Sequence, residues 1–302
     1  MIKKIIPFNN LYKTCNLASI ILIIISLLLL LIKGLNYGVD FKGGTLIEIR
    51  TNDKNISISD LRKSFNKMNL GDVTVKHFGS ENDFIVKFEK RNSNKSNFIE
   101  EIKNKLTNYI GDNYDFRRVE NIGPKVSSEL LKSGVIAIGL SLAAMLIYIW
   151  IRFEWQFSLG AIIAIFHDVI ITLGIFSLFS FEINLSIVAA VLTIIGYSMN
   201  DTVVIFDRIR ENLKKYSKIS ITEISDLSTN QTLSRTLITS VTTLLALFSI
   251  YIFGGAILKG FSFAMIIGVI VGTYSSIFVA TPILNYTNVN QKTILKEDTE
   301  NN

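Results

Sequence analysis

The sequence is poor in the residues that redox centres, zinc sites and nucleotide-driven enzymes require. It has one cysteine, Cys15, and two histidines, His77 and His167. A single cysteine excludes an intramolecular disulfide, and these three residues are too few and too scattered for a zinc site. There is no glycine-rich loop ending in Lys-Ser or Lys-Thr, and the Gly-Gly pairs at 43–44 and 254–255 match no nucleotide-binding fingerprint. We therefore expect no chemical catalysis, no cofactor and no metal.

Charged residues are also scarce. They make up 19% of the 302 residues, whereas hydrophobic residues make up 49%; a soluble domain is about a quarter charged. The mean hydropathy is +0.40, and the apolar residues fall into long runs, while the block from about 33 to 130 has the composition of a soluble domain. This unevenness predicts one water-exposed domain among membrane spans. The net charge of +6 is then expected to mark cytoplasmic loops and not a nucleic-acid partner.

Six apolar runs are long enough to cross a bilayer, which takes about 20 mostly apolar residues. The first has a basic start like a signal peptide, but no small-residue cleavage site follows it, so we expect a retained anchor. The runs are 17–32, 135–151, 157–179, 183–206, 237–253 and 261–284.

The basic residues of the loops predict the orientation. With the N-terminus inside, the inner side receives Arg152, the loop after the fourth run, and Lys292 and Lys296; the short outer connections hold only Lys259. Cytoplasmic loops carry an excess of Lys and Arg, so both termini are expected in the cytoplasm. The expected organisation is 1–33, N-terminus and first helix; 34–130, extracytoplasmic domain; 131–285, helices two to six; and 286–302, cytoplasmic tail.

The extracytoplasmic block alternates between strand and helix patterns. Alternating residues predict strands at 45–50, 73–77, 84–88 and 115–119, helical spacing predicts helices at 58–68 and 96–110, and 79–83 is expected to form a turn. This β-α-β-β-α-β order is typical of the ferredoxin-like fold. The expected fold class is therefore an α-helical polytopic membrane protein with six transmembrane helices and a small α+β ferredoxin-like domain between helices one and two.

Ionisable residues inside a membrane span cost free energy and call for an explanation. In the fourth run, Thr193, Tyr197, Asn200 and Asp201 share one helical stripe, which should face other helices or water. Asp201 is a candidate proton-accepting carboxylate. The alternative is a polar patch that only holds helices together.

A second stripe begins the fifth run with Arg235, Thr239 and Thr242/Thr243. Arg235 either snorkels to the headgroups or pairs with Asp201. An ion pair would couple proton binding to helix packing, because protonation of the carboxylate weakens the pair. The sequence leaves both alternatives open.

His167 and Asp168 lie near the middle of the third run. Together they are candidates for a proton relay. They can also satisfy each other as a structural pair, and we favour this second interpretation. In the sixth run, small residues recur at every fourth position, which indicates close helix packing. These residues are Gly260, Ala264, Gly268, Gly272 and Ser276.

Several motifs, taken together at their spacings, resemble the SecD/SecF family over roughly 33–284. An entry motif follows the first run and includes Asp40, Phe41, Gly43 and Gly44. Further matches are Gly123–Ser127, Arg152–Trp155, His167-Asp168, Gly196–Thr202, Phe206–Asn212 with Asp207 and Arg208, and Thr232–Thr236.

The resemblance implies a six-span half of a fold related to resistance-nodulation-division transporters, located in the bacterial inner membrane. It implies the family's smaller subunit, paired with SecD and binding the SecYEG channel, with YajC, membrane lipid and translocating preproteins as further partners. The pair would use the proton-motive force to help export proteins. By motif, the family's transmembrane Asp and Arg implicated in proton passage correspond to Asp201 and Arg235.

Two other functions remain open. A stand-alone proton-driven exporter of small molecules or lipids would share the six-span unit, although such proteins usually have larger external domains that occur twice in a longer chain. A scaffold would hold a translocon together without passing protons. A motor and a scaffold differ at Asp201: a motor needs the carboxylate, whereas a scaffold should tolerate asparagine.

Overall fold

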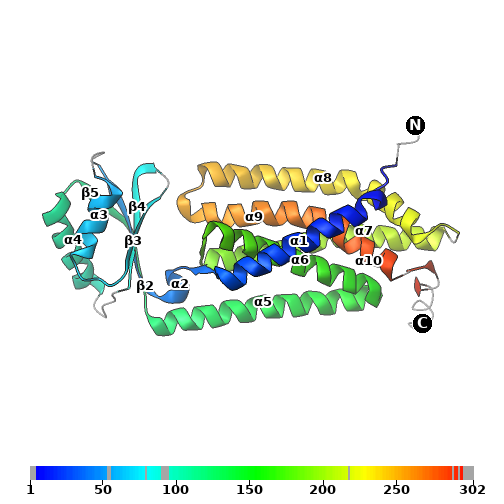
Figure 1. Ribbon diagram of the computed structural model, residues 1–302, viewed down its shortest axis with the longest axis horizontal. Helices are drawn as coiled ribbons and strands as arrows, with labels where there is room; N and C mark the ends of the chain where they lie inside the picture. Colours follow the sequence, from blue (N-terminus) through cyan, green and yellow to red (C-terminus); the bar gives the residue numbers. More distant parts are fainter. Residues whose placement is uncertain are drawn as a thin grey trace. The chain divides into compact units, whose positions relative to one another are not determined.

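The computed structural model describes residues 5–52, 56–78, 80–89, 95–216, 218–287, 289–291 and 293–294. The chain divides into two compact units, one of Met1–Asn36 with Ile136–Asn302 and the other of Tyr37–Val135; Figure 1 labels their helices and strands. The expectations for Gly79, Lys292 and Lys296 lie outside the described residues.

The first unit is built from long helices. They are α1 (Asn9–Ile32), α5 (Pro124–Arg152), α6 (Trp155–Phe179), α7 (Leu185–Lys215), α8 (Ile221–Phe253) and α9 (Ala256–Ser275), followed by the π-helical turn η1 (Ser276–Ala280) and α10 (Thr281–Tyr286); β1 (Asn36–Tyr37) and β6 (Glu182–Ile183) are short strands. The boundary between the units falls within α5, before Ile136, and within β1, after Asn36. In the described part of the chain, six helices are long and apolar enough to cross a membrane. The predicted spans are therefore confirmed, with α9, η1 and α10 forming the sixth.

Two helices extend further than the hydropathy predicts. The side chain of Asn184 caps α7, and the helix continues to Lys215, past the apolar run that ends at 206. Ser220 caps α8, so this helix begins at Ile221, well before the run that starts at 237. A hydropathy window finds only the apolar part of a helix, whereas the cap fixes its start.

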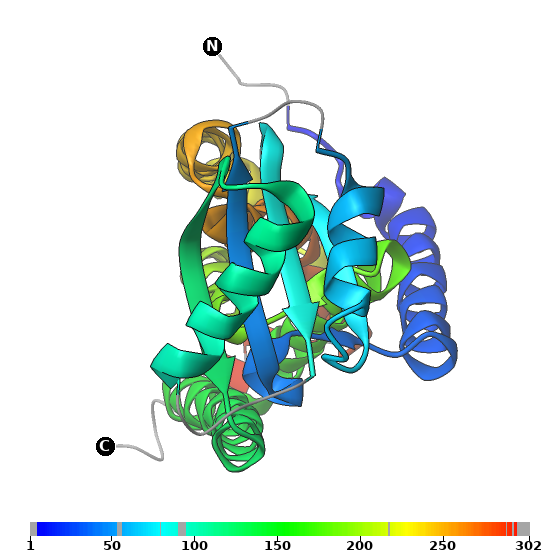
Figure 2. The ribbon, with the colours of Figure 1, turned by 90° about the vertical axis from the view of Figure 1, so that its left-hand side faces the viewer.

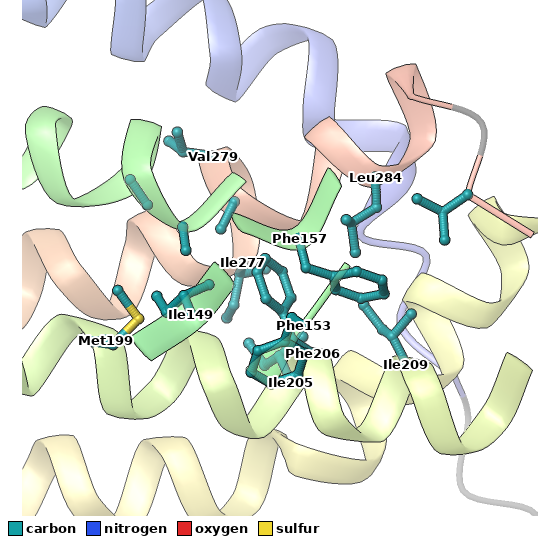
Figure 3. Packing of buried hydrophobic residues seen from close by; sticks show 14 of the residues in the cluster. Ile149, Phe153, Phe157, Met199, Ile205, Phe206, Ile209, Ile277, Val279 and Leu284 are labelled. Atoms are coloured by element: carbon teal, nitrogen blue, oxygen red, sulfur yellow. The ribbon is translucent and has the colours of Figure 1, made fainter. Parts of the chain in front are cut away.

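The helices differ in how much of their surface they bury. α6, α7 and the sixth span are half-buried or more, whereas α1, α5 and α8 expose most of their span residues. Their shared core includes an aromatic group in which Phe157 lies 5.9 Å from Phe153 and 5.2 Å from Phe206, measured between ring centroids. Figure 3 shows these rings between α6, α7 and η1, with Met199 and Ile205 nearby.

The small-residue stripe of α9 packs closely against α7, which confirms its predicted role. A Cβ atom added at Gly268 would overlap the side chain of Ile194, and one added at Gly272 would lie 3.0 Å from the Cβ atom of Ser198. Ala264 and Ser276 are fully buried. The glycines thus let two helix backbones approach each other more closely than larger residues would allow.

The second unit contains a four-stranded antiparallel sheet in the order β3-β4-β2-β5. Its elements in chain order are α2 (Val39–Lys42), β2 (Gly44–Thr51), α3 (Ile58–Asn66), β3 (Val73–Phe78), β4 (Ser80–Phe88), α4 (Lys95–Ile110) and β5 (Tyr114–Ile122). Figure 2 shows α3 and α4 on the same face of this sheet. Between helices and sheet lies a core that includes Ile47, Phe65, Val86 and Leu106.

The predicted strands and helices of this unit are confirmed, but the predicted turn at 79–83 is too long. β4 already begins at Ser80. Its first residue, Ser80, is paired with Phe78 of β3, and Asp83 lies opposite Arg50 of β2, whose Nε atom is 2.6 Å from the carboxylate. These pairings with β3 and β2 extend β4 through residues that look like a turn in the sequence.

The expected cap of the first helix in this unit is present. Ser57 caps α3, and its hydroxyl and backbone N–H both donate hydrogen bonds to Asp60. These bonds favour the ionised carboxylate and hold the pKa of Asp60 below its usual range.

The Gly43-Gly44 pair has a structural explanation in this unit. Gly43 ends α2 with φ +72°, and Gly44 begins β2 with φ +126°. A Cβ atom at Gly44 would lie 2.8 Å from the carbonyl oxygen of Phe88. Both residues need backbone conformations that favour glycine, and Gly44 also has no space for a side chain.

We expect Gly44→Ala to weaken the pairing of β2 with β4 by about 2 kcal/mol, because it combines backbone strain with a steric overlap. Hydrogen exchange of the β2 and β4 amides in the full-length chain should accelerate about 30-fold. Gly111→Ala is the matched control, since Gly111 has φ +78° but no atom within 4 Å of the added Cβ. Equal acceleration in both variants would show that the contact with Phe88 costs nothing.

Candidate functional site

Asp201 lies on α7 inside the helical unit. Its side chain is 4% exposed, and in the described part of the chain its Oδ2 atom has no hydrogen-bond partner. A carboxylate that only held helices together would be expected to use both oxygens. The structure therefore gives Asp201 a buried oxygen with unused hydrogen-bonding capacity.

Arg235 on α8 is close enough for its charge to act on the carboxylate of Asp201. Among the described residues, however, no ion pair within 4.0 Å joins the two, and the Arg235 side chain is exposed. The structure therefore places the two charges near each other without the direct ion pair that the sequence left open.

The two predicted polar stripes are only partly buried. Thr193 and Asn200 on α7 and Thr242 on α8 are exposed, although all three belong to membrane-length helices. The Tyr197 hydroxyl of α7 donates a hydrogen bond of 3.4 Å to Thr243 Oγ1 of α8 and so links the two helices. The two stripes therefore contain one buried carboxylate, that of Asp201, and several exposed polar residues. We call the latter the exposed polar residues of α7 and α8; they are Thr193, Asn200, Arg235 and Thr242.

A second buried carboxylate, Asp168 on α6, differs from Asp201 in having partners on both oxygens. Its Oδ1 atom lies 2.8 Å from His167 Nδ1. Its Oδ2 atom accepts hydrogen bonds from Ser198 Oγ on α7 at 2.5 Å and from Ser275 Oγ on α9 at 2.8 Å. The Asp168 side chain thus joins three helices in the interior, where it is 1% exposed.

His167 connects this cluster to α1. Its ring stacks on that of Tyr274 with 6.0 Å between centroids. The Tyr274 hydroxyl donates to the backbone oxygen of Cys15 at 2.8 Å and shares a hydrogen bond with Ser19. The Nε2 atom of His167 is buried and has no partner in the described part of the chain.

The motif residues Asp207 and Arg208 lie near the end of α7 and hold it to its neighbours. Arg152 Nη2 is 2.8 Å from Asp207 Oδ1, and Arg208 bonds Gln231 of α8 and Glu211, each at 2.6 Å. These contacts assign both motif residues a part in helix packing.

The remaining motif residues are those of the entry motif and Gly196. Asp40, Phe41, Gly43 and Gly44 belong to the second unit, where Phe41 is buried and its ring contacts that of Tyr37. Gly196 lies on α7, but an added Cβ would meet no atom within 4 Å.

Several polar contacts had no signal in the sequence. Asp226 of α8 accepts hydrogen bonds from the backbone and side-chain nitrogens of Asn9, and so caps α1 from outside that helix. Glu154 is 4% exposed and pairs with Arg210 at 2.9 Å. Ser275 lies outside every motif. In the described part of the chain, no group of His, Cys, Asp and Glu is suited to hold a metal ion.

Six membrane-length helices with carboxylates buried between them define a polytopic membrane protein. Two family profiles match the chain: "Protein export membrane protein SecD/SecF, C-terminal" over residues 101–290 and "SecD/SecF GG Motif" over residues 28–54. The chain belongs to the SecD/SecF family.

Relatives within the family resolve the type of subunit. The chain is 47% identical to the protein translocase subunit SecF of Rickettsia bellii, over 92% of this chain and 91% of the relative. It is 46% identical to that of Rickettsia rickettsii, over 92% and 90%. The matches therefore assign the chain to the SecF branch of the family.

A solved structure has the same fold. The crystal structure of SecDF from Thermus thermophilus, described as a translocon-associated membrane protein, matches with a TM-score of 0.81 and 32% identity. The match covers 93% of this chain but only 38% of that protein, so this chain corresponds to a part of the longer SecDF polypeptide.

We expect Arg210→Met to lower the free energy of unfolding by about 3 kcal/mol, because it leaves the buried Glu154 without its cation. Arg152→Met is the control: Arg152 and Asp207 are 44% and 40% exposed, and an exposed pair contributes less than about 1 kcal/mol. Unfolding of the full-length chain by denaturing detergent in mixed micelles measures the free energy of unfolding of both variants. An equal decrease in the free energy of unfolding in both variants would mean that the buried pair of Glu154 and Arg210 stabilises the chain no more than an exposed pair.

Proposed function

We propose that this chain is the SecF subunit of a Sec translocase and that, together with SecD, it couples the proton-motive force to protein export. The observation that carries the proposal is Asp201, a buried carboxylate on a membrane-length helix with one oxygen unpartnered in the described structure. Ionisable groups in such positions are costly and usually serve ion or proton movement.

Arg235 supplies the coupling between a proton and the helices. With Asp201 ionised, the positive charge of Arg235 would attract it and favour the approach of α8 to α7. Protonation removes the negative charge and with it this attraction. A proton arriving at Asp201 would thus change the relation of two helices, which is the step that a proton-driven motor requires.

We propose that SecD covers the exposed polar residues of α7 and α8. Side chains such as Asn200 and Thr242 are unfavourable against lipid and favourable against the polar face of another helix bundle. The SecDF structure supports this assignment, because there a segment with this chain's fold is part of a longer polypeptide.

The remaining parts of the proposal concern the second unit and the membrane. We propose a ferredoxin-like fold for this unit, which its β-α-β-β-α-β element order supports, and we place it outside the bacterial inner membrane with both termini in the cytoplasm. Exposed Trp150 and Trp155 flank Arg152, a combination typical of a membrane–water interface on the cytoplasmic side. In that membrane the complex would contact lipid, the SecYEG channel and YajC, and preproteins would emerge on the far side.

A scaffold without proton passage is the main alternative, and Asp201 separates it from a motor. An asparagine in its place would keep hydrogen-bonding groups of the same size but could not exchange a proton. We expect Asp201→Asn to lower the export rate at least about tenfold, in the range found when one proton-transferring group is lost. Export of a secreted precursor is measured in cells depleted of the native subunit and complemented with wild type or variant.

Asp112→Asn is the matched control, because it makes the same change at an exposed loop carboxylate and should leave export unchanged. Both variants are checked for co-purification with SecD, so that loss of assembly is not mistaken for loss of coupling. An Asp201→Asn variant that assembles and exports at the wild-type rate would favour the scaffold. Loss of small-molecule efflux without loss of export would favour an exporter.

A further inference from the structure

Both carboxylate oxygens of Asp168 already have partners in the protein. His167 occupies Oδ1, and the hydroxyls of Ser198 and Ser275 both donate to Oδ2. The hydroxyl of Thr172 bonds the backbone oxygen of Asp168, so the helix around it is also satisfied. In this respect Asp168 is the opposite of Asp201.

The contacts of Ser198 connect the hydrogen bonds of Asp168 to the rotation of α7 about its axis. Ser198 lies three residues before Asp201 on α7, and its backbone oxygen accepts a hydrogen bond from Thr202 Oγ1. Its side chain lies between Asp168 of α6 and Gly272 of α9, where even a single added carbon would come within 3.0 Å. A rotation of α7 about its axis would break the bond to Asp168 and push Ser198 into α9.

Ser275 is the last residue of α9 and fixes that helix at the point where its geometry changes. The π-helical turn η1 begins at the next residue, and Thr281 Oγ1 donates to the backbone oxygen of Ser276 at 2.8 Å. Such turns shift the register of the residues that follow. The bond from Ser275 to Asp168 therefore holds α9 just before this shift.

We propose that Asp168 is a positioning residue that fixes the rotation of α7 and thereby holds Asp201 toward Arg235. The proposal rests on the function proposed above for Asp201. It assigns no proton transfer to the His167-Asp168 pair, although a histidine and an aspartate in contact could serve as a relay.

The amide of asparagine can replace the carboxylate in every one of these contacts. Its oxygen accepts from both serines, and its NH₂ group donates to His167 Nδ1 once the ring proton resides on Nε2. A positioning role thus predicts that Asp168→Asn retains export within about threefold of wild type, whereas Asp168→Ala loses at least about tenfold. A proton-carrying role predicts that both variants fail.

The rotation of α7 can be measured independently of export, through the reactivity of cysteines placed on this helix. In a Cys15→Ser background, Thr202→Cys places a thiol at a position 1% exposed, and Asn200→Cys places one at an exposed position. The full-length chain in detergent is treated with a maleimide. We expect Cys at 202 to react slowly in the Asp168 and Asp168→Asn backgrounds and at least about tenfold faster with Asp168→Ala. Cys at 200 should react rapidly in all three.

If Asp168→Ala does not fold, Ser198→Ala combined with Ser275→Ala removes the same ties while keeping the carboxylate, and should expose Cys at 202 in the same way. Loss of export in Asp168→Asn with Cys at 202 still protected would overturn the proposal in favour of a proton carrier. Protection of Cys at 202 in Asp168→Ala would also overturn it. Normal export by Asp201→Asn would instead reject the proposed function, and the maleimide rates would still decide whether Asp168 positions α7.

Discussion

The structure depends on one constraint: inside a bilayer, a polar group must find its partners in the protein, because there is no water to supply them. The carboxylate of Asp168 meets this constraint at both of its oxygens, with hydrogen bonds from α7 and α9 and a contact with His167. Close approach of these helices is what allows such short side chains to reach the carboxylate, and the glycines of α9 permit that approach. Satisfaction of a single carboxylate and tight packing of three helices are therefore the same structural requirement.

Helix α7 carries the consequences of this constraint on its different faces. Ser198 faces the interior and is tied to α6, Asn200 is exposed, and Asp201 lies buried near the boundary between them. A proton-accepting group benefits from that position, because it is shielded from lipid yet remains beside a surface that a partner can complete. The fixed interior face and the incomplete outer face are both needed: without the first, Asp201 would have no defined orientation, and without the second, no access.

The sequence predicted the spans, the strands and helices of the second unit, and the candidate carboxylates, because apolar run length, alternation and charge inside a span are local signals. It did not predict that Ser275 bonds Asp168, since 107 residues separate them and periodicity says nothing of distant partners. Nor could it divide the stripe of Thr193 and Asp201 into exposed and buried members, because helical spacing gives a shared face but not what covers it. The start of α8 was missed for a similar reason: the polar residues 221–236 pack against other helices and leave no hydropathy signal.

Membership in a motif does not decide whether a residue is functional. Gly44 belongs to the entry motif because its φ angle and the nearby Phe88 carbonyl require glycine, and Asp207 and Arg208 belong to another because they bind neighbouring side chains. Each of these residues is explained by the contacts it makes. Asp201 is not, since a buried oxygen without a partner lowers stability and brings no packing in return. A cost of that kind calls for an explanation outside packing, and the proton-accepting role that we propose for Asp201 would supply one.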